Sequence, residues 1–383
     1  MRLSTPRWVS EGTALDVAVQ VLINGPISRA DIARRLHLSA GTLTRLTQPL
    51  LETGLLVEVG ELVSGQVGRP SRLLDVVPTS RHFIGIKLTG DHALGVITDL
   101  RANVVRSERA DLDGREPPAV IATVARLITT LAASAPAITA VGVGIGGLVG
   151  SGGTVISAPF LGWRDVDLAA ALEAETGLPV LVANDVTAFT EYERWFGGGR
   201  NLDRFAVITV GAGVGYGLVA GGEVVESEDS GLGLVGHWLL DPFGPLCAEG
   251  HRGCAQTVLA SAGVSAALSG ALGREIGYDE ALTLAEHGEP SARSVVDGAG
   301  RGLGQLVAAV ANLTMPQAVI LGGEGVRLAS VAGPAIQAGI AEHRNPRATP
   351  IELVTTSGDD SEWCRGAAVL ALVAHVLGPE EKS

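Results

Sequence analysis

The sequence of 383 residues has few cysteines and no long apolar run. Its three cysteines, Cys247, Cys254 and Cys364, are too few for a disulfide framework in a chain of this length. No apolar stretch approaches the roughly 18 to 20 residues that a membrane-spanning helix needs. The N-terminal segment also lacks the apolar middle section of a signal peptide. We therefore expect a cytoplasmic protein of two or three domains with no membrane association.

An overall positive charge is also lacking. Lys and Arg number 28 against 41 Asp and Glu, which gives a net charge of -13. This balance opposes DNA binding by the chain as a whole, because phosphate contacts depend on clustered basic groups. However, residues 1–77 hold eight Arg and seven acidic residues, about +1, which leaves about -14 for the remainder. Any contact with nucleic acid is therefore expected within residues 1–77.

Three short helices are expected in this N-terminal part. Ser28 and Asp31 have the spacing of a capping box and predict the start of the second helix. Leu43 and Leu50 give the third helix its buried side. Pro49 lies inside the third helix, where proline costs about 3 kcal/mol, so we expect a kink there. Three short helices with a tight second turn predict a helix-turn-helix.

The exposed face of the third helix carries hydroxyl, amide and guanidinium groups, which suit contacts with phosphates and base edges. A solvated helix face is the alternative interpretation. The next segment favours DNA, because an apolar run at 55–59, a glycine-rich loop and Arg72 before a second apolar run predict a wing. We predict a winged helix-turn-helix DNA-binding domain over residues 1–77. Its expected DNA contacts are Ser39, Thr42, Thr44, Arg45, Gln48 and Arg69.

From residue 80 the pattern changes to an alternation of strands and helices. Three apolar runs between 83 and 108 are followed by helix and strand in turn, and a comparable order restarts at Phe205. Such a repeat predicts two related α/β lobes, 80–190 and 191–362, with a ligand cleft between them. The last helix, 363–377, is expected to pack back on the first lobe.

Two segments suggest ligand contacts. Asn184 and Asp185 follow a strand and open a helix, so an amide and a carboxylate can reach a ligand; a capping role for Asp185 is the alternative. The segment Gly211–Gly217 is a glycine-rich turn of the kind whose N–H groups can approach phosphate, although glycine also serves ordinary tight turns.

Four potential metal ligands lie close together in the sequence. His237, Cys247, Glu249 and Cys254 fall within 18 residues and predict a tetrahedral zinc site in the second lobe. Structural zinc prefers thiolate and imidazole, so Glu249 is the weakest member of this set, and an exposed glutamate is its alternative interpretation.

These motifs together resemble the ROK family of repressors, open reading frames and sugar kinases, over nearly the whole chain. The resemblance implies an actin-like, ribonuclease-H-like body of the sugar-kinase type. It also implies that Asn184 and Asp185 hold sugar, with Asp185 as the vestigial kinase base, and that His237 contacts both sugar and zinc. The matching runs are Gly233-Leu-Val-Gly-His237, Cys247-Ala-Glu-Gly-His-Arg-Gly-Cys254-Ala-Gln256, Ile320-Leu-Gly-Gly323 and the Gly-Arg-Pro at 68–70.

Departures from the family pattern bear on catalysis. The family's kinases open the body with Asp-x-Gly-Gly-Thr, but this chain has Lys87-Leu-Thr-Gly-Asp91, so a lysine replaces the aspartate that helps hold Mg²⁺. Phosphoryl transfer depends on such metal and phosphate contacts. Leu234 and Gln256 stand where the family has glutamates, and leucine cannot accept a hydrogen bond from sugar. We expect a degenerate kinase fold without catalytic activity or bound ATP.

The sequence thus predicts a DNA-binding transcriptional regulator, a repressor of carbohydrate genes whose operator binding is modulated by a sugar or related metabolite. Its expected partners are double-stranded operator DNA, the effector and further copies in a homodimer or homotetramer. Three alternatives stay open: an ATP-dependent sugar kinase, a repressor regulated by a protein partner instead of a small molecule, and an activator. The expected ligand contacts are Asn184, Asp185, His237 and Gln256.

Overall fold

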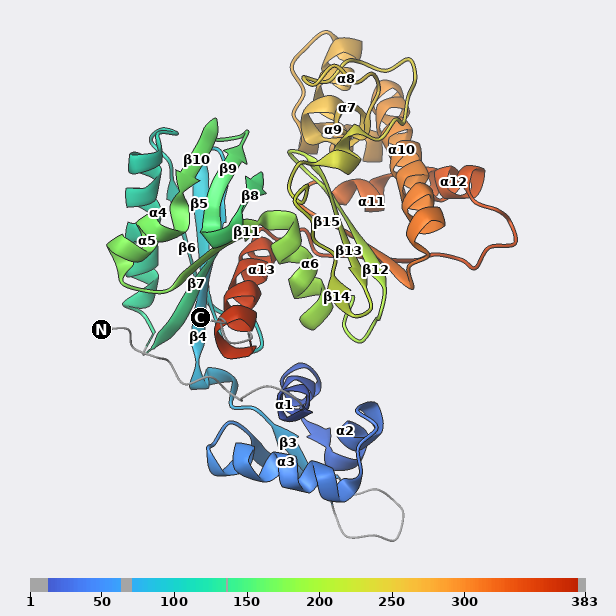
Figure 1. Cartoon of the computed structure of the whole chain (residues 1–383). Coiled ribbons are helices and arrows are strands. Elements are labelled where there is room, and N and C mark those ends of the chain that lie inside the picture. The colour runs from blue at the N-terminus through green and yellow to red at the C-terminus, as the bar shows by residue number, and fades with distance from the viewer. Residues whose placement is uncertain (1–12, 63–70, 136, 378–383) are drawn as a thin grey trace. The chain divides into compact units, whose positions relative to one another are not determined.

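The computed structural model in Figure 1 describes residues 13–62, 71–135 and 137–377. It has the mixed α/β fold that the sequence predicts, and it divides into two compact units that are interleaved along the chain. Among the described residues, no helix is both long and apolar enough to cross a membrane. Unit 1 comprises Met1–Val143, Asp167–Val182 and Cys364–Ser383, and unit 2 comprises Gly144–Val166 and Ala183–Trp363.

The N-terminal domain of unit 1 has the order of elements of a winged helix-turn-helix. Its strands pair in the order β1-β3-β2, with β2 and β3 antiparallel. The loop between these two strands contains Arg69 and lies outside the described residues. The elements are α1 (Thr13–Asn24), β1 (Ile27–Ser28), α2 (Arg29–Arg35), α3 (Ala40–Glu52), β2 (Val57–Leu62) and β3 (Ser71–Asp75).

Capping residues define where the helices of this domain begin. The Ser28 hydroxyl accepts a hydrogen bond from the Asp31 N–H at 3.1 Å, which confirms the predicted start of α2. Ser39 caps α3 in the same way, through the Thr42 N–H at 3.1 Å. The helix α3 continues through the exposed Pro49 to Glu52. The caps therefore fix the start of α3, the helix expected to contact DNA.

The main sheet of unit 1 has five strands in the order β11-β7-β4-β5-β6, in which β4, β5 and β6 pair antiparallel. Helix α13 lies against this sheet, because a Cβ at Gly85 or Gly142 would lie 1.8 Å from a backbone oxygen of that helix. The two glycines therefore allow direct packing of helix on strand. The elements are β4 (His82–Leu88), β5 (His92–Thr98), β6 (Val104–Asp111), α4 (Pro117–Ala132), β7 (Ile138–Ile145), α5 (Leu168–Thr176), β11 (Val180–Asn184) and α13 (Ser361–Leu372).

Unit 2 contains a second five-stranded sheet, in the order β14-β13-β12-β15-β16. An antiparallel hairpin, β12 with β13, is extended by β15 parallel to β12, so the sequence repeat corresponds to a second mixed sheet. Its strands are β12 (Phe205–Val210), β13 (Val214–Ala220), β14 (Glu223–Val224), β15 (Ala318–Gly322) and β16 (Glu352–Thr355). A separate three-stranded sheet consists of β8 (Leu148–Val149), β9 (Thr154–Ala158) and β10 (Trp163–Asp167).

The helices of unit 2 enclose its largest apolar core. Figure 1 shows α7 to α12 gathered at one end of the second sheet. The long helix α10 supplies buried side chains along much of its length, among them Leu303, Leu306 and Val307. The helices are α6 (Asp185–Trp195), α7 (Ala255–Leu259), α8 (Ser261–Leu272), α9 (Tyr278–Glu286), α10 (Pro290–Thr314), α11 (Arg327–Val331) and α12 (Gly333–His343).

Candidate functional site

The exposed face of α3 carries most of the residues expected to contact DNA. Thr44, Arg45 and Gln48 are exposed, and Thr42 is half-buried. The Thr44 hydroxyl donates to the Ala40 carbonyl at 2.9 Å, and the Gln48 amide donates to Glu52 at 2.9 Å. No described residue pairs with the exposed Arg45 guanidinium. Arg45 is therefore the basic group of this face that is available for phosphate or a base edge.

Two further arginines lie at the base of the wing. Arg29 of α2 and Arg72 of β3 donate to the two oxygens of Glu58 on β2, at 2.8 and 2.9 Å. The hydrogen bonds from Arg72 and then Arg29 hold the pKa of the Glu58 carboxyl below its usual range. This carboxylate therefore joins the second helix to both strands of the wing.

In unit 2, Asn184 and Asp185 lie where α6 begins. Asn184 caps the helix, since its side-chain oxygen accepts from the N–H groups of Val186 and Thr187 at 2.9 and 3.2 Å. Its amide nitrogen donates to the Gly147 carbonyl at 2.9 Å. One Asp185 oxygen accepts from the Val186 N–H at 2.9 Å. The N-cap of α6 is therefore Asn184 and not Asp185, for which capping was the alternative interpretation. The Asp185 carboxylate lies in the first turn of the helix, where the helix dipole favours a negative charge.

Glycines bring two loops close to this pair. A Cβ at Gly231, whose φ is +102°, would lie 2.2 Å from the Gly147 oxygen and 3.2 Å from the Asn184 amide nitrogen. A Cβ at Gly146 would lie 3.4 Å from an Asp185 oxygen. The segment that begins at Gly231 leads into the short 3-10 helix Leu234–His237, which carries the half-buried His237. The backbone therefore packs tightly around the two polar side chains.

The glycine-rich turn between β12 and β13 is held by two side chains. The Ala212 N–H donates to the Glu324 carboxylate at 2.7 Å, and a Cβ at Gly211 would lie only 2.1 Å from that carboxylate. Gln256 accepts from the Val214 N–H at 3.3 Å and donates to the Ala212 carbonyl at 3.2 Å. The Ala212 N–H, which could otherwise donate to a phosphate, therefore already donates to the Glu324 carboxylate. Sequence reasoning missed Glu324, whose only signal is its place directly after the Gly322-Gly323 turn.

The turn after Lys87, where the sequence departs from the kinase pattern, lies in unit 1 and is closed by its own side chains. The Thr89 hydroxyl donates to Asp91 at 2.8 Å, and His92 Nδ1 lies 2.7 Å from the same carboxylate oxygen. These hydrogen bonds, that from Thr89 first, hold the pKa of Asp91 below its usual range. Arg115 donates to the Gly90 carbonyl at 3.1 Å. The loop between β4 and β5 is thus stabilised without a phosphate.

Three of the four expected metal ligands come together in unit 2. The ligand atoms of His237, Cys247 and Cys254 all lie within 4.8 Å of one another. Thiolate and imidazole are the donors that structural zinc prefers, so this set fits such an ion. Glu249 is exposed and is not part of this group. His251, which sequence reasoning did not select, lies beside it, with Nδ1 3.7 Å from Cys247 Sγ.

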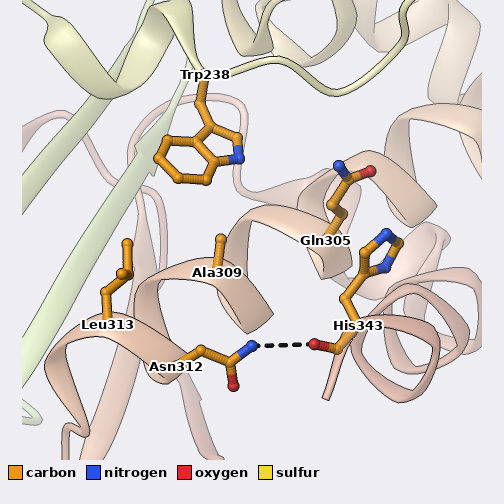
Figure 2. A pocket seen from close by; sticks show the side chains of 6 residues that line it. All are labelled: Trp238, Gln305, Ala309, Asn312, Leu313 and His343. Carbon is orange, nitrogen blue, oxygen red and sulfur yellow. Dashed lines mark hydrogen bonds between the residues drawn. The ribbon is translucent and has the colours of Figure 1, made fainter.

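A hollow of about 300 Å³ lies on unit 2 near the metal-ligand segment. Figure 2 shows Trp238 facing the helix that carries Gln305, Ala309 and Leu313, and the Asn312 amide donating to the His343 carbonyl at 3.0 Å. Exposed apolar patches of this kind mark sites of contact with other molecules. The two segments that border this hollow also carry seven exposed apolar side chains, which we call collectively the apolar surface: Leu234, Trp238, Leu239, Phe243, Leu246, Leu313 and Met315.

Comparisons with known proteins agree with this geometry. The sequence model of the ROK family matches residues 83–374. The DNA-binding transcriptional repressor Mlc of Escherichia coli (strain K12) is 25% identical over 90% of this chain and 89% of its own length. The DNA-binding transcriptional dual regulator NagC of the same strain is 28% identical over 82% and 80%. The xylose repressor of Bacillus subtilis (strain 168) is 25% identical over 79% of each chain.

Solved structures of a regulator and of a kinase of the ROK family both align with this chain. A ROK family transcriptional regulator, described as a homologue of the E. coli Mlc protein, aligns with a TM-score of 0.80 and 26% identity over 95% of this chain and 96% of its own. A ROK family glucokinase from Streptomyces griseus, in complex with glucose and AMPPNP, aligns with a TM-score of 0.66 and 23% identity over 76% of this chain and 99% of its own. The glucokinase likeness concerns the fold alone.

Proposed function

This chain belongs to the ROK family, and on that premise we propose that it is a DNA-binding transcriptional repressor whose hold on its operator responds to a carbohydrate. One observation carries the proposal: the winged helix-turn-helix precedes a body of the sugar-kinase type. The regulator structure aligns with 95% of this chain, whereas the glucokinase aligns with 76%. The related regulators Mlc and NagC bear DNA-binding in their names, which supports the same role here.

The proposed DNA interface is the exposed face of α3 together with the wing. Ser39, Thr42 and Thr44 present hydroxyl groups for phosphates, and Arg45 and Gln48 present the donors that read base edges. Arg69, outside the described residues, is assigned to the wing contact. Two such domains in an oligomer would bind two related half-sites, as two-fold DNA-binding proteins do.

The proposed effector is a sugar or related metabolite held by Asn184, Asp185, His237 and Gln256. Carboxylate and amide oxygens accept hydrogen bonds from sugar hydroxyls, and imidazole can donate or accept. A metal bound by His237, Cys247 and Cys254 would stabilise the segment that carries His237 and orient its imidazole. The effector changes DNA affinity only to the extent that it binds one state of the protein more tightly than the other.

We also propose that phosphoryl transfer has been lost. Lys87 brings a positive charge to the position where the kinases have a metal-binding aspartate. Glu324 places a carboxylate on the Ala212 N–H, and a phosphate approaching that turn would meet a like charge. Lys87 and Glu324 both act against the metal and phosphate contacts on which this chemistry depends.

The oligomer is proposed to form through the apolar surface. Phe243 is 91% exposed and Leu313 is 67% exposed, which is costly in water unless another molecule covers them. A second copy of the chain offers a matching apolar surface about a two-fold axis. The exchange of Phe243 for Asp should lower the oligomeric state, measured by light scattering, while Phe160→Asp, an exposed aromatic elsewhere in unit 2, should leave it unchanged.

The experiment that tests the regulatory role measures binding of the full chain to DNA from upstream of its own gene, at fixed salt, with and without a panel of sugars. We expect tight binding that one sugar weakens. Asp185→Asn should reduce this sugar response by about tenfold or more and leave DNA binding without sugar unchanged, because Asn184, not Asp185, caps α6. Absence of DNA binding would overturn the proposal.

A regulator that responds to a protein partner is the second candidate. Gln256 favours it, because each end of its amide already makes one hydrogen bond to the glycine-rich turn, which leaves only one N–H and one oxygen lone pair for sugar. DNA binding that no sugar alters would select this candidate.

A further inference from the structure

The segment that carries the predicted metal ligands folds into a tight hairpin. Isolated β-bridges join Leu239 to Cys254 and Leu246 to Arg252. At the tip, the Cys247 N–H donates to the His251 carbonyl at 2.9 Å, and the Gly250 N–H donates to the Cys247 carbonyl at 3.0 Å. This turn contains Glu249, and Gly250 adopts a φ of +85° that favours glycine. The hairpin therefore sets the side chains of residues 247 and 251 at adjacent positions.

Three donor atoms, two from this hairpin and one from the 3-10 helix before it, are spaced like the vertices of a metal-coordination tetrahedron. Cys247 Sγ lies 3.7 Å from His237 Nδ1 and 3.7 Å from His251 Nδ1, and the two imidazole nitrogens lie 3.1 Å apart. For tetrahedral zinc with bonds of about 2.05 Å to nitrogen and 2.3 Å to sulfur, the expected edges are about 3.6 Å for S to N and about 3.3 Å for N to N. Each observed edge lies within about 0.2 Å of the expected one.

We propose that His251 is the fourth ligand of a Cys₂His₂ site for a zinc-class divalent cation, together with His237, Cys247 and Cys254. The inference goes beyond the regulatory role, because it concerns which residue of this chain supplies the fourth metal ligand. The cation chemistry follows from the donors, since soft thiolate and borderline imidazole ligands in a tetrahedral arrangement select zinc over magnesium or calcium.

Burial shields the Cys254 sulfur from water, which suits a ligand in a structural metal site. Cys254 is 0% exposed, and its sulfur lies 4.0 Å from the Thr257 hydroxyl. As a metal ligand this sulfur would be a thiolate, and the cation would offset the cost of burying its negative charge. His237 and Cys247 lie within 4.8 Å of Cys254 and could share that charge.

The charge balance favours His251 over Glu249. Two thiolates and two neutral imidazoles around a divalent cation give a site of zero net charge. With Glu249 in place of His251 the site would carry one negative charge, in a chain that already carries -13. Glu249 also lies exposed in the turn between the two residues that the hairpin brings together. An imidazole at residue 251 therefore fits both the charge and the geometry.

The test uses the purified full chain and needs neither DNA nor sugar, so its failure is distinct from a failure of the proposed function. Metal content is measured by mass spectrometry, and the chain is reloaded with Co²⁺, whose absorption spectrum reports tetrahedral geometry and thiolate ligands. We expect one Zn²⁺ per chain and X-ray absorption from two sulfur and two nitrogen neighbours. A parent chain that holds no metal would overturn the proposal.

Variants separate the two candidate fourth ligands. His251→Ala should lower Zn²⁺ affinity by at least about 100-fold, since even outer-shell changes cost 10 to 100-fold, while Glu249→Ala should leave it within about twofold of the parent. His251→Cys should retain the metal and change the spectrum to three sulfurs and one nitrogen, which guards against a variant that merely misfolds. Loss of metal in Glu249→Ala together with retention in His251→Ala would refute the assignment.

Discussion

The guanidinium of Arg101 donates to the carboxylate of Asp75, which ends the last strand of the N-terminal domain. The same guanidinium donates to the backbone oxygen of Val21 in α1 at 3.4 Å. Arg101 belongs to the turn between β5 and β6, and Arg365 of α13 donates to the Ala102 carbonyl of that turn at 2.8 Å. Within unit 1, the DNA-binding domain is therefore tied to the same turn as the C-terminal helix.

Arg101→Ala should loosen this attachment. The side chains of Asp75 and Arg101 are only 14% and 20% exposed, so the change leaves a poorly hydrated carboxylate without its partner and costs about 1 to 3 kcal/mol. We expect faster amide hydrogen exchange in β3 and the end of α1. Arg109→Ala is the matched control, because its pair with Asp111 is 53% and 79% exposed. Equal exchange in both variants would contradict a structural role for Arg101.

Arg45→Ala should weaken operator binding by about 1 to 3 kcal/mol if the guanidinium reads a base. If it contacts a phosphate, binding should weaken on all sequences and depend less steeply on salt. Fluorescence anisotropy with operator and unrelated DNA at several salt concentrations distinguishes the two. Arg126→Ala, an exposed arginine on α4, serves as the control. Unchanged operator binding in the Arg45 variant would remove α3 from the interface.

Glu58 should make the N-terminal domain sensitive to acid. Arg72 and Arg29 lower its folded pKa below the ordinary value of 4.5, so its stabilisation is fully present above that value and is lost as the pH falls through the lowered pKa. The loss should be at most about 1 kcal/mol, since both arginines are partly exposed. Hydrogen exchange of α2 and β2 between pH 6 and 3, chosen as about the range of the titration, measures it. Glu58→Gln should flatten this dependence, and an equally steep profile in that variant would assign the effect to other carboxyl groups.

Glu324→Ala should increase the affinity of the glycine-rich turn for phosphate groups. The change removes a negative charge and frees the Ala212 N–H, which in the parent chain donates a hydrogen bond to Glu324 at 2.7 Å. In calorimetry, we expect a nonhydrolysable ATP analogue to bind the Glu324→Ala variant about tenfold more tightly than it binds the parent chain. This corresponds to a gain in binding free energy of about 1.4 kcal/mol. Glu223→Ala, an exposed acid at β14, should show no gain. Phosphoryl transfer to a sugar by the parent chain would refute the proposed loss of activity.

Local patterns were enough to predict the N-terminal domain and the kind of body. Ser28 and Asp31 cap α2 as their spacing predicts, because a cap depends on residues only three positions apart. The strand and helix alternation predicted two related α/β lobes, and the structure has two five-stranded sheets, since periodicity follows from which face of each element is buried. The same sequence motifs identified the family, and a match over residues 83–374 confirms it.

The contacts that decide the chemistry of the sites came only from the tertiary structure. Glu324 reaches the Ala212 N–H across 112 positions, and Arg101 reaches Asp75 across 26, and no local pattern encodes either pairing. His251 stands only four residues from Cys247, yet its approach to His237 depends on the fold of the whole hairpin. Sequence spacing determines which residues share an element, whereas the packing of distant elements determines which side chains meet.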